Sequence, residues 1–263
     1  MKVGIIGAGT MGSGIAQAFA QVDGYEVCLC DINEEFASNG KLKITKNFEK
    51  RVAKGKMAKE DADKILARIH TGVKTICSDC DLVVEAAIEN MEIKKQTFKE
   101  LGAICKADCV FATNTSSLSI TEIGAGLDRP VIGMHFFNPA PVMKLVEVIA
   151  GLNTPVEIVD KVKKISEEIG KIPVQVEEGA GFVVNRILIP MINEAIGIYA
   201  EGEASGEVWT LFWLSWKYFS LRLVTRSTVR SRFLERWFAA ASLAVSLAKA
   251  STSTTNMYIS LAS

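Results

Sequence analysis

A run of three glycines, Gly7 to Gly12 in the spacing G-x-G-x-x-G, most constrains how this 263-residue chain can fold. The apolar segment 2–6 before it predicts a strand, and the segment after it has helical spacing. A second predicted strand, 26–30, ends beside Asp31. Glycine spacing alone is a weak signal. The order strand, loop, helix and strand, however, predicts an α/β domain with a doubly wound, Rossmann-type sheet that binds a dinucleotide.

Each residue of this run has a physical task in the predicted domain. Gly7 makes a tight turn, Gly9 lets the backbone approach a pyrophosphate, and Gly12 lets the helix pack closely on the strand. Thr10 and Met11 open the helix, whose unpaired N–H groups attract phosphates. We therefore predict that these five residues contact the cofactor.

Asp31 indicates which dinucleotide the predicted site prefers. A carboxylate at this position accepts hydrogen bonds from the adenosine ribose hydroxyls, and its charge repels a 2′-phosphate. Ile32 and Asn33 follow it, and no Arg is present there to hold such a phosphate. The sequence therefore predicts NAD rather than NADP as the cofactor. A glycine turn in an unrelated α/β protein is the alternative.

Composition excludes several classes of function. The formal net charge is zero, which argues against a general binder of nucleic acids or membrane surfaces. No apolar stretch reaches about 20 residues without a charge, so no membrane span is expected. Six cysteines without a signal peptide predict reduced thiols in a cytoplasmic protein. The C-x-x-C run Cys77–Cys80 has no second pair and no histidine at metal spacing, so no metal site is predicted.

Residues 33–70 are rich in Lys and Glu, have helical periodicity and break at Gly55, which predicts a helical pair projecting from the nucleotide domain. Seven Lys and Arg residues cluster between Lys41 and Lys56. A solvated face is the default interpretation of such a cluster, and a docking surface for a phosphorylated part of the substrate is the alternative. His70 is expected to end the second helix.

Two further strands, over 81–87 and 109–113, continue the pattern, with a helix over 92–104 between them. Turns after the C-terminal ends of parallel strands face the ligand crevice, so their polar residues are candidates for the site. These candidates are Glu89, Asn114 and Ser116. Ser117 is expected to be the N-cap of a helix over 118–123.

The stretch 131–149 places a histidine, an asparagine and a carboxylate among apolar residues. His135 follows a run that predicts a short buried strand, so its ring is expected at the strand end, where α/β enzymes present side chains to ligands. Glu147 lies in a second apolar run, where a carboxylate either faces solvent or needs a buried partner. A satisfied core histidine and a half-exposed glutamate are the alternative, but their grouping around Asn138 favours a site.

Beyond this stretch the pattern changes from alternating strands and helices to helices. A helix is expected after the N-cap Thr154, then a strand over 171–176 and a long buried helix over 181–201. The change predicts a nucleotide-binding domain over 1–178 and the start of a helical domain for substrate binding and dimerisation over 179–206.

Five motifs carry a resemblance to a known family. They are G-A-G-T-M-G-S-G-I-A-Q (7–17), E-A-A-I-E-N (85–90), N-T-S-S-L-S-I (114–120), H-F-F-N-P-A-P-V-M-K-L-V-E-V-I (135–149) and G-F-V-V-N-R (181–186). On these residues the chain resembles the short-chain 3-hydroxyacyl-CoA dehydrogenases, most closely the bacterial 3-hydroxybutyryl-CoA dehydrogenases, from residue 1 to about 205. The resemblance implies reversible, NAD-linked oxidation of a (3S)-3-hydroxyacyl-CoA, such as 3-hydroxybutyryl-CoA, to the 3-ketoacyl-CoA.

The resemblance also implies roles in the chemistry. His135 matches the catalytic base that takes the proton of the 3-hydroxyl, and Glu147 matches the carboxylate that pairs with it. Ser116 and Asn138 match residues that contact the substrate's oxygens and the nicotinamide region.

Further matches concern binding. Asn185 matches an asparagine of the substrate site, and Lys54 matches a lysine that reaches the phosphates of CoA. Glu89 and Lys94 match contacts of the cofactor, and Asn114 is expected on the cofactor side of the same crevice. An acyl-CoA is thus the implied partner, and a homo-oligomer is implied if the C-terminal domain is intact.

Residues 207–263 depart from the family. They contain all four tryptophans, no glycine and no proline, and seven Lys or Arg against two Glu. The preferred explanation is an out-of-frame translation or a sequence error, which leaves the helical domain incomplete after about residue 206. Shifting the reading frame near codon 206 should then restore a family-like C-terminus. The alternative is a diverged tail whose tryptophans form an apolar interaction surface.

Two other functions stay open. The altered tail is compatible with a protein that binds NAD but does not turn over substrate. A different β-hydroxyacid dehydrogenase with the same glycine run is also possible, although those enzymes usually rely on a catalytic lysine. The spacing of His135 and Glu147 argues against the latter.

Overall fold

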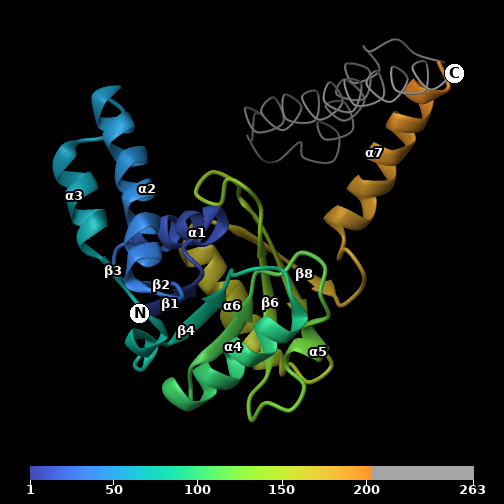
Figure 1. Cartoon of the computed structure of the whole chain (residues 1–263), viewed down its shortest axis with the longest axis horizontal. Coiled ribbons are helices and arrows are strands. Elements are labelled where there is room, and N and C mark those ends of the chain that lie inside the picture. The colour runs from blue at the N-terminus through green and yellow to red at the C-terminus, as the bar shows by residue number, and fades with distance from the viewer. Residues whose placement is uncertain (203–263) are drawn as a thin grey trace, which may run out of the picture. The chain divides into compact units, whose positions relative to one another are not determined.

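The computed structural model describes residues 1–202, and its first compact unit spans Met1–Arg186. Within the described residues, eight strands form one sheet in the order β3-β2-β1-β4-β5-β6-β7-β8 (Figure 1). Neighbouring strands are parallel except for β6 and β7, which pair antiparallel. The strands are β1 (Lys2–Ile6), β2 (Glu26–Cys30), β3 (Ile69–Gly72), β4 (Leu82–Glu85), β5 (Val110–Thr113), β6 (Val131–Phe136), β7 (Leu145–Ala150) and β8 (Ile172–Glu177).

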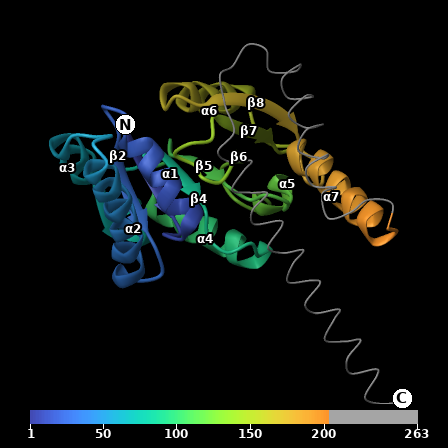
Figure 2. The ribbon, with the colours of Figure 1, turned by 90° about the horizontal axis from the view of Figure 1, so that it is seen from above.

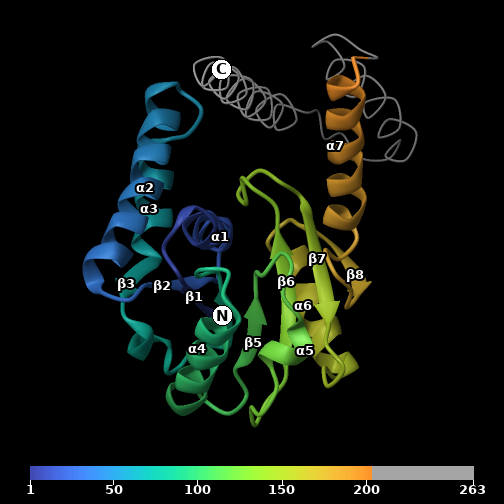
Figure 3. The ribbon, with the colours of Figure 1, turned by 45° about the vertical axis from the view of Figure 1, so that its right-hand side comes forward.

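Helices cover both faces of the sheet (Figures 2 and 3). One face packs against α1, α2, α3 and α6, and the other packs against α4, α5 and the 3₁₀ turn η1. Their bounds are α1 (Thr10–Ala20), α2 (Glu34–Ala53), α3 (Lys59–Ala67), η1 (Lys74–Cys77), α4 (Met91–Ile104), α5 (Ile120–Ile123) and α6 (Val156–Glu168). The predicted doubly wound, Rossmann-type α/β fold is therefore confirmed. A last helix, α7 (Val184–Ala200), runs into a second unit that begins at Ile187.

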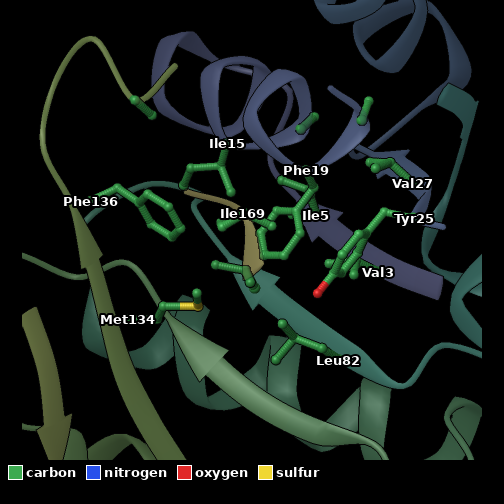
Figure 4. Packing of buried hydrophobic residues seen from close by; sticks show 14 of the residues in the cluster. Val3, Ile5, Ile15, Phe19, Tyr25, Val27, Leu82, Met134, Phe136 and Ile169 are labelled. Atoms are coloured by element: carbon green, nitrogen blue, oxygen red, sulfur yellow. The ribbon is translucent and has the colours of Figure 1, made fainter. Parts of the chain in front are cut away.

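The helix after the glycine run is anchored by a dense apolar core (Figure 4). Ile15 and Phe19 of α1 are fully buried. The ring of Phe19 lies 5.5 Å from that of Tyr25 and 6.5 Å from that of Phe136, measured between centroids. Burying a side chain of this size stabilises the fold by about 1.5–3 kcal/mol. The core therefore fixes the N-terminus of α1 next to the end of β1.

The strand order determines where a ligand can bind. β1 pairs with β2 on one side and with β4 on the other. Successive strands are therefore added first on one side of β1 and then, from β4 onward, on the other side. Ligands of such sheets bind outside the C-terminal strand ends next to this reversal. The glycine run, Asp31, the 85–90 segment and the turn 114–117 follow the ends of β1, β2, β4 and β5. All four segments therefore meet at one edge of the sheet.

The expectation that His70 ends a helix is wrong. The predicted helical pair is present as α2 and α3, which lie side by side in Figures 1 and 3. However, α3 ends at Ala67, and His70 lies in β3, where it pairs with Cys28 of β2. Ile69 beside it is buried. A four-residue strand is too short to display a period in the sequence, so its pairing with β2 decides the conformation.

Two predicted N-caps are also wrong. α5 begins at Ile120, and Ser119 rather than Ser117 caps it by accepting a hydrogen bond from the N–H of Glu122 at 3.1 Å. Pro155 occupies the N-cap position of α6. The Thr154 hydroxyl bonds to backbone groups of the preceding loop and strand instead. In both cases a side chain near the helix start had a competing partner that the sequence does not reveal.

Three other expectations concern membrane spans, metal sites and the cysteine thiols. In residues 1–202, no helix is long and apolar enough to cross a membrane. The same residues contain no group of three or more His, Cys, Asp or Glu side chains that could hold a metal ion. All six cysteines belong to the described part of the chain, and each is a buried free thiol. The atypical tail, 207–263, lies outside the described residues.

Candidate active site

The glycine run has the geometry that its spacing predicts. Gly7 adopts a φ of +98°, and its N–H donates to the carbonyl of Cys30 at 2.8 Å, which joins the ends of β1 and β2. A Cβ on Gly12 would lie 1.7 Å from the carbonyl oxygen of Gly7. By contrast, apart from Gly9 and its two neighbours in the sequence, no residue of the described chain has an atom within 4 Å of a Cβ built on Gly9. The loop thus leaves no room for a side chain at Gly12, whereas it leaves free space beside Gly9.

The N-terminus of α1 faces this open space. Gly9 is its N-cap, and in the described residues no side chain bonds to the first N–H groups of the helix. The first turn contains no acidic residue, and it begins with the exposed Thr10 and the half-buried Met11. The uncapped N–H groups and the positive end of the helix dipole favour an anion here. These groups and the open space over Gly9 fit a pyrophosphate.

A pocket of about 480 Å³ lies between the glycine run and α2. It is lined by Ala8, Gly9, Asp31, Phe36, Asn39, Leu42, Lys43 and Lys46. The Asp31 carboxylate accepts hydrogen bonds from the N–H groups of Ala8 and Ile32, both at 2.7 Å, which fixes its position at the end of β2. The pocket, the carboxylate and the helix N-terminus together fit a dinucleotide.

His135 and Glu147 form a buried pair. The antiparallel register of β6 and β7 puts the two residues directly opposite each other. His135 Nδ1 lies 2.8 Å from Glu147 Oε2, and the side chains are 8% and 2% exposed. Burial alone would raise the pKa of Glu147, but hydrogen bonds from His135 and from the Val184 N–H outweigh it and hold the pKa below its usual value. Glu147 is therefore an ionised acceptor, and Nδ1 carries the proton.

The other oxygen of Glu147 fixes the start of α7. Oε1 accepts hydrogen bonds from the N–H groups of Val183 and Val184 at 3.2 and 3.0 Å. Phe182, just before them, is buried and has a φ of +51°, which a bulky residue adopts only where its surroundings hold it. Its ring centroid lies 5.6 Å from that of His135, and the Phe137 centroid lies at 4.6 Å. His135 is thus held on three sides, and among residues 1–202 its Nε2 has no hydrogen-bond partner.

The predicted asparagines differ in their surroundings. Asn114 Oδ1 accepts a hydrogen bond from the Phe136 N–H at 2.8 Å, which ties the end of β5 to the end of β6. Asn185 Nδ2 donates to the carbonyl of Ser116 at 3.4 Å, so the start of α7 reaches the turn after β5. Asn138 is exposed in the loop after β6. The structure therefore brings these residues to the edge of the sheet that carries His135.

Glu89 organises the turn after β5. Its Oε1 accepts hydrogen bonds from the Thr115 hydroxyl at 2.6 Å, the Ser116 N–H at 2.9 Å and the Ser117 hydroxyl at 3.2 Å. Burial would raise the pKa of Glu89, but the bonds from Thr115 and the Ser116 N–H and the nearby Lys94 hold the pKa below its usual value. Glu89 Oε2 lies 3.3 Å from Lys94 Nζ. The carboxylate thus links a partly exposed turn to a buried cation.

Lys94 and Lys54 occupy very different positions. The Lys94 side chain is 1% exposed, and its Nζ lies 2.8 Å from both oxygens of the buried Glu85. Lys54 is exposed and follows the last residue of α2, which is roughly 30 Å long for its 20 residues. It does not line the pocket at Asp31, whereas Lys43 and Lys46 of the same basic cluster do. The roles assigned to both lysines remain predictions.

Sequence reasoning missed two parts of this site. Glu85 is a carboxylate in the apolar strand β4, and this is the same signal that singles out Glu147. Phe36 and Leu42 form an exposed apolar wall of the pocket. No signal in the sequence distinguishes them from other surface residues of a helix that is otherwise polar.

Comparison with known proteins adds three findings. The sequence model described as "3-hydroxyacyl-CoA dehydrogenase, NAD binding domain" matches residues 2–179, and the corresponding C-terminal domain model matches 181–208. A 3-hydroxybutyryl-CoA dehydrogenase of Clostridioides difficile is 52% identical over 210 residues, which cover 79% of this chain and 74% of that protein. A probable 3-hydroxybutyryl-CoA dehydrogenase of Deinococcus radiodurans is 47% identical over 211 residues, covering 79% and 75%.

A solved structure resembles the described fold. The crystal structure of (S)-3-hydroxybutyryl-CoA dehydrogenase from Ralstonia eutropha superimposes with a TM-score of 0.75 at 44% sequence identity. The match covers 78% of this chain and 74% of the other. The likeness therefore extends over most of both chains.

Proposed function

The chain belongs to the 3-hydroxyacyl-CoA dehydrogenase family of NAD-dependent oxidoreductases, and we propose that it interconverts (3S)-3-hydroxybutyryl-CoA and acetoacetyl-CoA. The buried His135–Glu147 pair carries this proposal, because its 2.8 Å contact provides an oriented base at the ligand edge of the sheet. The names of the relatives from C. difficile and D. radiodurans support a four-carbon acyl group. The proposal also places the protein in butyrate or fatty acid metabolism.

Proton transfer is the part of the reaction that the chain's own residues perform. Glu147 accepts a hydrogen bond from the Nδ1–H of His135, so the unshared electron pair of the ring lies on Nε2. Nε2 takes the proton of the 3-hydroxyl, and the negative charge of Glu147 stabilises the imidazolium that results. In the reverse reaction the imidazolium returns the proton to the forming hydroxyl. Phe137 and Phe182 exclude water from the ring on two sides.

Cofactor binding involves the other end of the crevice. The N-terminus of α1 and the space over Gly9 hold the pyrophosphate, and Asp31 bonds to the adenosine ribose. NAD, when bound, supplies the acceptor for the hydride that leaves C3 of the substrate. Glu89 and Asn114 flank the nicotinamide half of the site in this proposal.

Substrate contacts are assigned to four residues. Ser116 and Asn138 contact the substrate's oxygens, Asn185 closes the site from α7, and Lys54 meets the phosphates of CoA. The hydrogen bond from Asn185 to the carbonyl of Ser116 supports the placement of Asn185 beside Ser116. We assign residues 1–178 to the nucleotide-binding domain and 179–206 to the start of the helical domain.

The compartment and the oligomeric state of the protein are proposed from its cysteines and from the exposed apolar residues of α7. We propose a cytoplasmic compartment, where thiols such as those of the six buried cysteines stay reduced. We assign a homodimer, formed through the helical domain. The exposed Ile187, Ile189 and Ile196 of α7 support burial of this helix by further protein.

A protein that binds NAD without turnover is a second candidate. The C-terminal family model stops matching at residue 208, so the region that would complete the helical domain lacks family character. Isothermal titration with NADH and an acetoacetyl-CoA reduction assay separate the two candidates. Binding with turnover is the expected result. Binding without turnover would favour the second candidate, and turnover of a free hydroxyacid but not of its CoA thioester would contradict both.

Glu147→Gln tests the proton-transfer assignment. A carboxamide has one acceptor oxygen, so it cannot accept from both His135 Nδ1 and the backbone N–H groups at the start of α7. If its NH₂ group faces His135, the ring proton moves to Nε2 and the base is lost. We expect kcat to fall roughly 10- to 100-fold, the equivalent of one charged hydrogen bond, while NADH affinity stays unchanged. The matched control is Glu157→Gln, a replacement of an exposed glutamate in the first turn of α6. Near-normal kcat in folded Glu147→Gln protein would refute the assignment.

A further inference from the structure

Glu85 is a buried charge that the proton-transfer chemistry does not use. It ends β4, and its side chain is fully buried. Oε1 accepts the Ala87 N–H at 2.7 Å, Oε2 accepts the Thr113 hydroxyl at 2.7 Å, and Lys94 Nζ lies 2.8 Å from both oxygens. A carboxylate has about four acceptor sites, and all of them are used. The group is therefore fully satisfied and fixed in one orientation.

Lys94 connects this buried carboxylate to an exposed one. Its Nζ lies between Glu85 and Glu89, at 2.8 and 3.3 Å. The Glu89 side chain is 38% exposed, whereas those of Glu85 and Lys94 are at most 1% exposed. The three charges therefore run from the core to the edge of the sheet, with the cation in the middle.

Glu89 connects Lys94 to Ser116, which belongs to the proposed substrate site. With Oε2 held by Lys94, Oε1 points at the turn after β5 and bonds the Ser116 N–H at 2.9 Å and the Ser116 hydroxyl at 3.3 Å. Asn185 approaches the same residue from α7, at its carbonyl. The position of Ser116 therefore depends on which way Glu89 points.

A purely structural role explains this arrangement poorly. A buried ion pair is often no more stabilising than apolar side chains of the same volume, because both charges lose their hydration. The ion pair does, however, fix the position of its cation, here the ammonium group of Lys94. Here that place is next to Glu89, at the edge where the glycine run and His135 also lie.

We propose that Glu85 is a positioning residue for the dehydrogenase reaction: by holding Lys94 in place it aims Glu89, and through Glu89 the Ser116 turn, at the nicotinamide and substrate. The inference rests on the proposed function. Without Glu85, Lys94 has Glu89 as the only carboxylate within 4 Å in the described residues. The ammonium then moves toward Glu89 and competes with the donors of the turn, so both Glu89 and Ser116 lose their fixed orientation.

A double-mutant cycle with Glu85→Gln and Lys94→Met tests the proposal. We expect Glu85→Gln to raise the dissociation constant for NADH at least about tenfold and to lower kcat for acetoacetyl-CoA, the size of effect seen when a charged hydrogen bond is lost. In the Lys94→Met background, adding Glu85→Gln should cause no further change beyond about twofold, because Glu85 acts through Lys94. Effects that multiply independently, or unchanged constants in folded Glu85→Gln protein, would overturn the proposal.

Asp81→Asn is the matched control. Asp81 precedes the same strand at its opposite end and pairs there with Lys106, at 2.5 Å. Its replacement should leave the NADH dissociation constant unchanged. An equal rise in both variants would show that loss of any ion pair on β4 loosens the fold, and the positioning role would be refuted.

Thr113→Val serves if Glu85→Gln does not fold. It keeps all three charges and the side-chain shape but removes the hydroxyl bond to Glu85, together with the longer bond, 3.3 Å, that the same hydroxyl accepts from the Thr115 N–H. We expect the NADH dissociation constant to rise roughly twofold to tenfold, as for one neutral hydrogen bond; no rise would contradict the proposal.

The wild-type protein distinguishes a failure of the proposed function from a failure of the role proposed for Glu85. If it neither binds NADH nor reduces acetoacetyl-CoA, the proposed function itself fails, whereas normal wild-type activity with insensitive variants refutes only the role of Glu85.

Discussion

A methyl group added at Gly12 should lower the stability of the fold, whereas one added at Gly9 should lower the affinity for the cofactor. In Gly12→Ala the new Cβ would lie 1.7 Å from the Gly7 carbonyl oxygen and 2.9 Å from its carbon. These are backbone atoms of a tight turn, so they cannot rotate away as a side chain would. We expect a loss of about 3 kcal/mol in the free energy of unfolding, the upper end for an overpacked site.

Gly9→Ala meets no such obstacle. Gly9 has a φ of −69°, which any residue adopts, and a Cβ there contacts nothing within 4 Å in the described residues. Stability should therefore change by less than about 1 kcal/mol. The methyl group does, however, occupy the space into which the pyrophosphate fits. NADH affinity should fall at least about tenfold, which corresponds to 1.4 kcal/mol.

The two variants are compared by thermal unfolding and by titration with NADH. Gly12→Ala should unfold roughly 6–12 °C below the wild type, and Gly9→Ala should unfold near it. Titration should detect the loss of affinity in Gly9→Ala under conditions where the protein is folded. Unchanged NADH affinity of Gly9→Ala would refute the assignment of this space to the cofactor. A Gly12→Ala protein as stable as the wild type would refute the packing argument.

Two further predictions concern charges. Burial, with a contribution from Lys144, lowers the pKa of Lys171 from 10.5 to about 8. Between these values the unfolded chain binds more protons than the folded one, so stability relative to Lys171→Met should rise by up to about 3 kcal/mol from about pH 7.5 to about pH 10. Urea unfolding of both proteins at the two pH values measures this rise, and a constant or falling difference would contradict it. For Asp31→Asn, loss of the charge should weaken NADH binding while NADPH binding improves or falls less; a parallel loss of both would disprove a role in cofactor choice.

The beginning of the fold could be predicted because its signals are local. The strands over 2–6 and 26–30 agree with β1 and β2, and the glycine run lies between β1 and α1 as its spacing requires. Gly7 and Gly12 are the only kind of residue that their turn and packing tolerate, so the constraint is visible in the chain itself. Elements whose conformation depends on distant partners were less predictable. β3 forms because it pairs with β2, and no period in four residues reports that pairing.

His135 and Glu147 illustrate what a sequence determines about a site. A carboxylate in an apolar strand must find a buried partner or solvent, so the sequence alone made Glu147 conspicuous. The family resemblance implied His135 as that partner, and the antiparallel register of β6 and β7 shows how the two side chains meet, at 2.8 Å. The start of α7, which bonds the other oxygen of Glu147, is separated from it by more than 30 positions and entered the site only through tertiary structure.

The sequence by itself determined the fold class and the cofactor, because each depends on residue types at short and fixed spacings, and its resemblance to a known family made His135 the predicted base. Tertiary structure alone decided how the charges of the site share partners. Glu85, Lys94 and Glu89 lie within ten residues of one another, yet their order from core to surface depends on β4 packing against β5 and on the helix that presents Lys94. The physical reason is that burial and charge balance are properties of the packed chain, and the spacing of residues along the sequence does not contain them.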